Sequence, residues 1–286
     1  MRGRFATAAV LALALAATAC GRVAGPGGGG SDSIEHPTGS DRLVLRAETG
    51  GGFVAPAYEL RRIPDFSLFG DGRLVTEGPV VEIYPGPALP NVLVRTVSED
   101  GIQAVLEAAK GAGLFGPDAH YDFPCIADAP TTTFTVYAEG IRHEVSAYAL
   151  GEGQATCSGA DVEARSKLAA FERKLTDLQS WLPQGSLGAE GPFDPAAMRA
   201  YVQPYAQAPD PGLEQQVVDW PLGGPLATFG EPDPNLPDTR CGVVSGSDLQ
   251  TLLPLAEKAS ELTPWRSAGT DYSLLFRPLL PDESGC

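Results

Sequence analysis

The sequence predicts an α+β fold in which mostly antiparallel sheets with hairpins pack against about three helices. Two observations support this. Short apolar runs separated by Asp-Gly, Glu-Gly and Ala-Gly pairs are typical of antiparallel strands joined by tight turns. Only three segments, at residues 100–113, 161–182 and 244–256, repeat apolar residues at the three-and-four spacing of an amphipathic helix. We therefore expect helices on one face of the sheets.

The strands expected in the first half lie at residues 42–48, in a hairpin over 66–78, in two short strands over 80–97 and in a hairpin over 131–150. The first segment alternates apolar and polar residues, as a half-buried strand does. The hairpins are predicted to turn at Asp71-Gly72 and Glu139-Gly140, because such pairs favour the backbone of a tight turn. Prolines within residues 80–97 divide this stretch into two short strands, because proline has no backbone N–H to donate to a neighbouring strand.

Capping signals and periodicity define the helices. In the first helix, Asp100 with Gln103 is similar to a capping box, and Gly113 is a favourable stop. Its apolar positions are Ile102, Val105, Leu106 and Ala109. The second helix, from about Asp161 to Leu182, has Leu168, Phe171, Leu175, Leu178 and Leu182 at spacings of three and four.

Residues 183–192 read as a loop or boundary, which predicts an N-terminal α+β domain over 41–185 and a smaller one over 192–286. Strands are expected at 198–207 and 214–220, with a final hairpin turning at Ala268-Gly269. Residues 97–109 align without gaps on 244–256, so either a strand, helix and hairpin unit is repeated or two amphipathic helices are alike by chance. Pro254 should kink the third helix.

The first 19 residues predict an export signal. Arg2 and Arg4 form a short positive region, and Phe5 to Ala17 form an apolar segment of 13 residues. Crossing a hydrocarbon core takes about 20 helical residues, so this segment is too short for a permanent span. We interpret residues 1–19 as a signal peptide.

The sequence Ala17-Thr18-Ala19-Cys20 resembles the lipobox of bacterial lipoproteins. The resemblance implies that Cys20 receives a diacylglyceryl group and becomes the first residue of the mature chain, anchored in the cell membrane on its extracytoplasmic face. Ala17 departs from the Leu that lipoboxes usually carry, and the alternative is an ordinary signal peptide cut at an Ala-x-Ala site. Residues 20–40 then follow as a lipidated cysteine and flexible tether, because seven glycines leave little apolar surface to bury. Such a chain reaches about 25 Å.

The charge of the chain excludes some partners. Its formal net charge is −16, and loss of residues 1–19 removes two arginines and no acid, which makes it −18. Such a surface repels nucleic acid and anionic lipid. We therefore expect no nucleic-acid partner, attachment to the membrane only through the lipid anchor, and an envelope protein as the possible partner.

Cys125, Cys157, Cys241 and Cys286 remain after Cys20. An even number in an exported chain predicts two disulfides, and four cysteines allow three pairings. We favour Cys125 with Cys157 and Cys241 with Cys286, because each pair closes within one expected domain. Each loop would then contribute about 4 kcal/mol in the chain-entropy model. A metal site is not expected, since no C-x-x-C unit is present.

Candidates for catalysis and ligand binding are weak, and no cofactor is expected. The three histidines are His36 in the tether and His120 and His143 near strands, and Ser245 lacks the pattern of a nucleophile elbow. A buried His120 or His143 paired with a serine and an acid would indicate an enzyme. Acidic loop residues without calcium-loop spacing are Asp118, Asp122, Asp128, Glu231, Asp233 and Asp238. Two interpretations of the tryptophans are open: they line a groove for a carbohydrate or peptide, or, more simply, they pack in the core. These residues are Trp181, Trp220 and Trp265.

Residues 58–148 resemble uncharacterised bacterial lipoprotein and envelope modules, in which an Asp-Gly hairpin, a helix that begins near a serine and a Thr-Thr hairpin recur. The resemblance implies no established activity. The function expected is a non-enzymatic binding or structural role in the envelope, with small-molecule binding as the alternative and an envelope hydrolase as a third. A shallow surface with an exposed apolar patch would favour the first, and a deep apolar pocket with converging polar groups the second.

Overall fold

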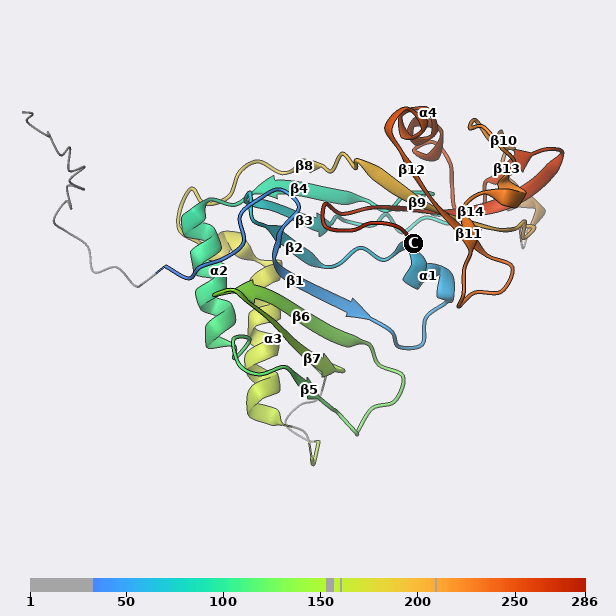
Figure 1. Ribbon diagram of the computed structural model, residues 1–286. Coiled ribbons are helices and arrows are strands. Elements are labelled where there is room, and N and C mark those ends of the chain that lie inside the picture. The colour runs from blue at the N-terminus through green and yellow to red at the C-terminus, as the bar shows by residue number, and fades with distance from the viewer. Residues whose placement is uncertain (1–32, 153–156, 160, 209) are drawn as a thin grey trace, which may run out of the picture. The chain divides into compact units, whose positions relative to one another are not determined.

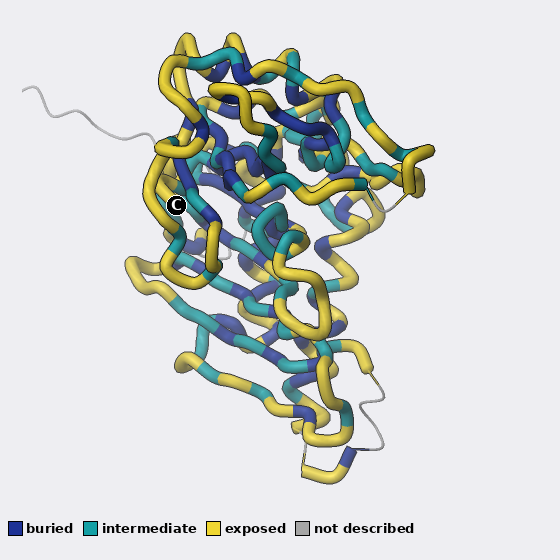
Figure 2. Tube along the Cα trace, turned by 90° about the vertical axis from the view of Figure 1, so that its right-hand side faces the viewer, coloured by how far each residue is buried: buried dark blue, intermediate teal, exposed yellow. Residues whose placement is uncertain are grey.

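The computed structural model describes residues 33–152, 157–159, 161–208 and 210–286 (Figure 1). It confirms the α+β class, with two mixed, mostly antiparallel sheets of eight and six strands. Three helices of seven or more residues are present in the described ranges. Buried residues follow the strands, while the connecting loops are mostly exposed (Figure 2).

The first sheet has the strand order β5-β7-β6-β1-β2-β3-β4-β8. Its strands are β1 (Leu43–Gly50), β2 (Phe66–Phe69), β3 (Arg73–Glu77), β4 (Val92–Thr96), β5 (Ala119–Tyr121), β6 (Thr131–Ala138), β7 (Ile141–Tyr148) and β8 (Gly191–Pro192). Only the β5–β7 pair among these is parallel. Gly72, Glu139 and Gly140 have positive φ at the two predicted turns, which are confirmed.

The second sheet has the order β10-β13-β14-β9-β12-β11. Its strands are β9 (Ala197–Pro204), β10 (Val218–Asp219), β11 (Glu231–Pro232), β12 (Arg240–Ser245), β13 (Pro264–Ser267) and β14 (Thr270–Pro278). β13 and β14 form the predicted hairpin, with Ala268 and Gly269 at positive φ. Trp265 packs edge-on against Phe276, with ring centroids 5.4 Å apart, inside the core of this sheet.

The helices are α1 (Pro56–Arg61), α2 (Glu99–Gly111), α3 (Val162–Thr176) and α4 (Gly246–Ala256), with 3₁₀ turns at Leu178–Ser180, Pro211–Leu213 and Leu226–Thr228. α2 and α3 lie side by side against the first sheet (Figure 1). The Ser98 hydroxyl accepts a hydrogen bond from the Gly101 amide and caps α2, rather than the Asp100 cap expected. The first core joins Val105 and Leu106 of α2, Phe171 of α3 and Phe134 of β6.

The two halves share an order of elements but differ in their connections. A strand, a helix and a hairpin occur in the same order as β4, α2, β6–β7 and as β12, α4, β13–β14, although β5 lies between α2 and β6 in the first half. In the first half the first hairpin strand, β6, pairs with β1, whereas in the second half the last hairpin strand, β14, pairs with β9. The aligned apolar positions are buried in both helices, apart from half-buried Leu253. The likeness therefore extends to local patterning and not to the order of strands in the sheets.

Besides the cap of α2, the second helix ends at Thr176 instead of Leu182. Two larger expectations also differ from the structure. Residues 80–84 were expected to form a strand. Instead, residues 78–91 form the loop that connects β3 to β4. Prolines at both ends of 80–84 remove the amides that pairing needs. The second difference concerns the expected tether. Ile34 is buried in the first core, and its backbone amide and carbonyl both bond the Gln103 side chain, at 2.8 and 3.0 Å.

Residues 279–286, called the strap, follow β14 and contact both sheets. Leu280 is buried with Ile63, Phe69 and Val75 against the first sheet. Asp282 pairs with Arg46 of β1 at 2.8 Å. Cys286 is joined to Cys241 of β12 by a disulfide. The strap therefore connects elements that are far apart in the chain.

A buried arginine side chain stabilises the β5–β7 edge of the first sheet. Arg165 of α3 is fully buried and donates to the carbonyls of Tyr121 at 3.0 Å and Ala149 at 2.7 Å. Its guanidinium also lies over the Phe123 ring, 4.7 Å from the centroid. Burial lowers the pKa of Arg165. Because the disulfide Cys125–Cys157 closes the same region, covalent and polar contacts together fix the segment between β5 and α3.

Candidate functional site

The predicted covalent sites have different outcomes. Cys20, with the rest of the expected signal and lipidation sequence, lies outside the described residues. Both disulfides have the pairing favoured from the sequence. Cys125 and Cys157 have Cα atoms 5.8 Å apart, and Cys241 and Cys286 have Cα atoms 6.0 Å apart.

One histidine meets a serine and an acid. His120 Nδ1 lies 2.7 Å from Ser146 Oγ, and its Nε2 lies 3.0 Å from Asp122 Oδ1. The histidine and aspartate side chains are 53% and 81% exposed. Neither cavity described below is lined by these residues. The constellation is present, but it lacks the burial that a catalytic arrangement was expected to show.

The remaining histidine and serine candidates have structural contacts. His143 stacks on Phe115 with centroids 5.7 Å apart, and its Nδ1 lies 3.0 Å from the Gly116 carbonyl. His36 is close to Glu99 Oε1, at 3.1 Å, beside the start of α2. Ser245 is the N-cap residue of α4. None of these contacts assembles a nucleophile and a base within the described chain.

Two of the acidic loop candidates accept hydrogen bonds from backbone amides. Asp118 accepts the Glu144 amide at 2.8 Å, and Asp233 accepts the Asn235 amide at 2.9 Å. No group of three or more histidine, cysteine, aspartate or glutamate residues able to hold a metal occurs among the described residues. Trp220 and Trp265 pack edge to face in the second core. Trp181 donates to the Lys174 carbonyl at 2.8 Å.

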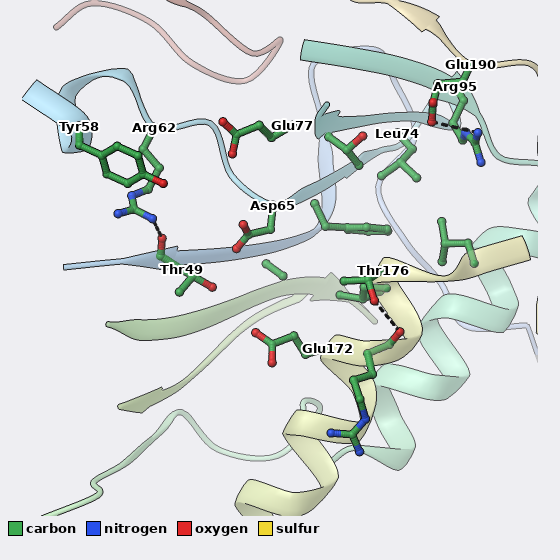
Figure 3. Close-up of a pocket in the computed structure, with 16 residues that line it drawn as sticks. Thr49, Tyr58, Arg62, Asp65, Leu74, Glu77, Arg95, Glu172, Thr176 and Glu190 are labelled. Carbon is green, nitrogen blue, oxygen red and sulfur yellow. Dashed lines mark hydrogen bonds and ion pairs between the residues drawn. The ribbon is translucent and has the colours of Figure 1, made fainter. Parts of the chain in front are cut away.

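A cavity of about 690 Å³ lies between the end of α3 and the face of β1, β2, β3 and β4 (Figure 3). It is open to solvent. Its apolar lining residues are Ala47, Phe66, Leu74, Leu175 and Leu178. Its other lining residues are Thr49, Tyr58, Arg62, Asp65, Thr76, Glu77, Arg95, Glu172, Arg173, Thr176 and Glu190. An apolar floor is thus surrounded by charged groups.

Three carboxylates from separate elements face this cavity. Asp65 precedes β2, Glu77 ends β3 and Glu172 belongs to α3, and Figure 3 shows the three around one space. Burial raises the pKa of Glu77, and the charge of Asp65 adds to the shift. Burial and Asp65 likewise raise the pKa of Glu172, although Thr132 donates a hydrogen bond to it. Burial and the neighbouring negative charge therefore disfavour the ionised forms of Glu77 and Glu172.

Two arginines of the cavity already have acidic partners. Arg62 donates to Glu59 at 2.5 and 3.1 Å and to the Thr49 carbonyl. Arg95 pairs with Glu190 at 2.9 Å. Among the described residues, Asp65, Glu77 and Glu172 form no ion pair within 4.0 Å. The third lining arginine, Arg173, likewise forms no ion pair among the described residues, and its charge lowers the pKa of Glu172. Three carboxylates against one guanidinium leave a net negative charge for a ligand.

An exposed apolar segment begins three residues after Glu77, which lines the cavity. Residues 80–84, called the apolar loop, expose Val80 by 70%, Val81 by 56%, Ile83 by 63% and Tyr84 by 59%. Exposed large hydrophobic side chains are ordinary when single, but four within five residues indicate a contact surface. Tyr58 of α1, itself 57% exposed, lines the cavity.

A second cavity, of about 450 Å³, lies beside β9 and residues 226–240. Its polar groups are used within the chain. Asp233 accepts turn amides, and Arg240 donates to the carbonyls of Phe229 and Gly230 at 2.9 and 2.6 Å. The first cavity is therefore the better candidate for binding.

Within the ranges that the structure describes, no helix is both long and apolar enough to span a membrane. Comparisons with protein-family models, with curated proteins and with solved structures each found no match for this chain.

Proposed function

We propose that this protein is a lipid-anchored, extracytoplasmic binding protein of the bacterial cell envelope and acts by recognition, without an enzymatic activity. The anchor rests on the Ala-Thr-Ala-Cys20 sequence and the glycine-rich segment after it. Two disulfides support the location, because disulfides persist mainly in oxidising compartments. The net charge of −16 supports attachment by a lipid instead of by surface electrostatics.

The observation that carries the binding role is the open cavity beside an exposed apolar loop. Small-molecule sites are mostly enclosed and apolar, with few polar groups. Here seven charged residues line the cavity, and exposed apolar side chains lie next to it. Recognition of a partner protein fits this surface better than enclosure of a small molecule.

Cys20→Ser should move the protein from the membrane fraction to the soluble fraction or leave its signal uncleaved, because no thiol remains to receive the diacylglyceryl group. Fractionation of cells and intact-mass analysis of the native protein provide the measurement. The wild-type chain should carry the mass of a lipidated N-terminal cysteine. An unmodified mature N-terminus in the wild type would contradict the anchor.

The binding role predicts contact at the apolar loop in the native envelope. We expect Ile83→p-benzoylphenylalanine to give a photo-crosslinked adduct of defined mass. Ile141, the first residue of β7, is 55% exposed and is the matched control position. Equal crosslinking at both positions would indicate random collision and would contradict recognition through the loop.

A hydrolase is the second candidate, because His120 contacts both Ser146 and Asp122. We expect a fluorophosphonate probe to leave Ser146 unlabelled, since an imidazole in water has no enclosed site in which to activate the hydroxyl. Mass spectrometry of the probe-treated native protein, with Ser146→Ala alongside, checks this. Labelling of Ser146 that His120→Ala abolishes would replace the binding proposal with an enzymatic one.

A further inference from the structure

The apolar loop and the large cavity are connected at both ends of the loop. Glu77 lines the cavity, and Val80 follows three residues later, so their Cα atoms are at most about 11 Å apart. At the far end, Arg61 donates to the Pro87 carbonyl at 2.8 Å. Arg61 is adjacent in sequence to Arg62, which lines the cavity. A single short extended peptide segment of a partner is therefore long enough to contact both the apolar loop and the cavity.

Hydrogen bonds hold the ends of the loop. The Gly78 amide donates to the Asn91 carbonyl at 2.8 Å, and the Gly86 amide donates to Glu261 Oε1 at 3.0 Å. The Ala88 amide donates to the Ala259 carbonyl at 3.0 Å. A loop fixed at both ends presents its apolar side chains at a lower entropic cost than a free segment does.

The charges around this surface select its partner. Asp65, Glu77 and Glu172 have no ion pair among the described residues, and Glu82 lies within the loop itself. Against these four carboxylates, Arg173 is the one lining arginine without an ion pair among the described residues, so the surface is negative on balance. A partner with acidic residues would be repelled, whereas a basic one would be attracted and oriented. An arginine or lysine stem also suits the apolar floor at Phe66, because its methylene groups pack on apolar surface while its charge meets the carboxylates.

We propose that the apolar loop and the cavity form one docking surface for a basic, extended segment of another envelope protein. An arginine or lysine of that segment enters the cavity, and its apolar neighbours contact Val80, Ile83 and Tyr84. This inference rests on the proposed binding function and names the chemistry of the partner. A membrane surface fits less well, because Glu82 and the three carboxylates would face anionic headgroups.

The test selects random twelve-residue peptides displayed on phage against the purified full chain with its disulfides intact. We expect enrichment of peptides in which arginine or lysine is flanked by aliphatic or aromatic residues. Binding of the best synthetic peptide should weaken about tenfold in Ile83→Ser, because buried apolar area is lost. It should weaken about fivefold in Glu77→Gln, and it should also weaken as salt increases.

Two matched variants control for general effects of substitution. Ile141→Ser removes a similarly exposed apolar side chain, and Glu107→Gln removes an exposed carboxylate on α2. Both should retain the wild-type affinity. Equal losses in Ile83→Ser and Ile141→Ser would overturn the assignment of the surface.

The remaining outcomes separate this inference from the function on which it rests. Selected peptides that lack basic residues, yet depend on Ile83, would overturn the basic partner and leave the binding function standing. Binding to phosphatidylglycerol vesicles that Ile83→Ser abolishes would overturn the protein partner in favour of a membrane. Enrichment of no peptide, together with no crosslinked adduct at Ile83, would overturn both proposals.

Discussion

Replacing Arg277 by methionine should lower the free energy of unfolding by about 4 kcal/mol at neutral pH, because breaking a buried ion pair leaves an uncompensated charge. Arg277 and Glu283 are joined by two hydrogen bonds, of 2.6 and 2.7 Å, and both side chains are largely buried. Arg277 Nε also donates to the Arg62 carbonyl at 2.7 Å. Denaturant unfolding with the disulfides intact measures the change.

The matched control is Arg266→Met, in the neighbouring strand. Arg266 pairs with Asp271 through bonds of 2.8 and 2.9 Å, but the pair is in solvent, so its loss should change the unfolding free energy little. Equal effects of the two substitutions would contradict a special role for the buried pair.

The same pair predicts a dependence of stability on pH. Burial opposes the ionisation of Glu283, but the hydrogen bonds and charge of Arg277 outweigh it and hold the pKa of Glu283 below its ordinary value of 4.5. A lowered pKa in the folded state stabilises the protein above pH 4.5, and this contribution is lost as the pH falls through the folded value. Glu283→Gln should therefore be less stable than wild type at pH 7, and the difference should shrink in acid.

Replacing Cys241 and Cys286 together by serine should also cost about 4 kcal/mol of unfolding free energy in the chain-entropy model. The disulfide spans a sequence separation of 45 residues, so its loss frees a large loop in the unfolded chain. The measurement is denaturant unfolding of the double variant against wild type. A loss below about 1 kcal/mol would mean that the strap is fixed by its ion pairs and Leu280 alone.

Local signals predicted much of the fold. Glu139-Gly140 and Ala268-Gly269 turn as expected, because their positive φ values are a property of the dipeptide and its flanking strands. Periodicity found the buried faces of α2 and α3. The prediction of a flexible tether was wrong at Ile34, because it rested on the polar composition of the neighbouring residues. The contact of Ile34 with Gln103 of α2 depends on tertiary structure, which local composition does not reveal.

The candidate site was not predictable in the same way. Its carboxylates at positions 65, 77 and 172 come from three elements and follow no spacing that a motif search reads. The β2–β3 hairpin, whose register pairs Ser67 with Val75, brings positions 65 and 77 to the same end of the two strands, and the packing of α3 across the sheet adds position 172. One signal was visible in the sequence: an apolar run, residues 80–84, enclosed by prolines. We assigned it to a strand, yet a run that proline excludes from pairing is also what an exposed contact loop looks like.

The disulfide pairing bears on how the protein would oxidise under the proposed export. Consecutive cysteines are joined, Cys125 with Cys157 and Cys241 with Cys286, so a chain that emerges in order can form its first native bond before the third thiol arrives. Acylation of Cys20 would remove the one thiol that precedes them. Sequential oxidation alone then produces the native pairs, and thiol–disulfide exchange to correct wrong ones is not needed. Under the proposed export, we therefore expect a host with an oxidase and no disulfide isomerase to be sufficient to make this protein.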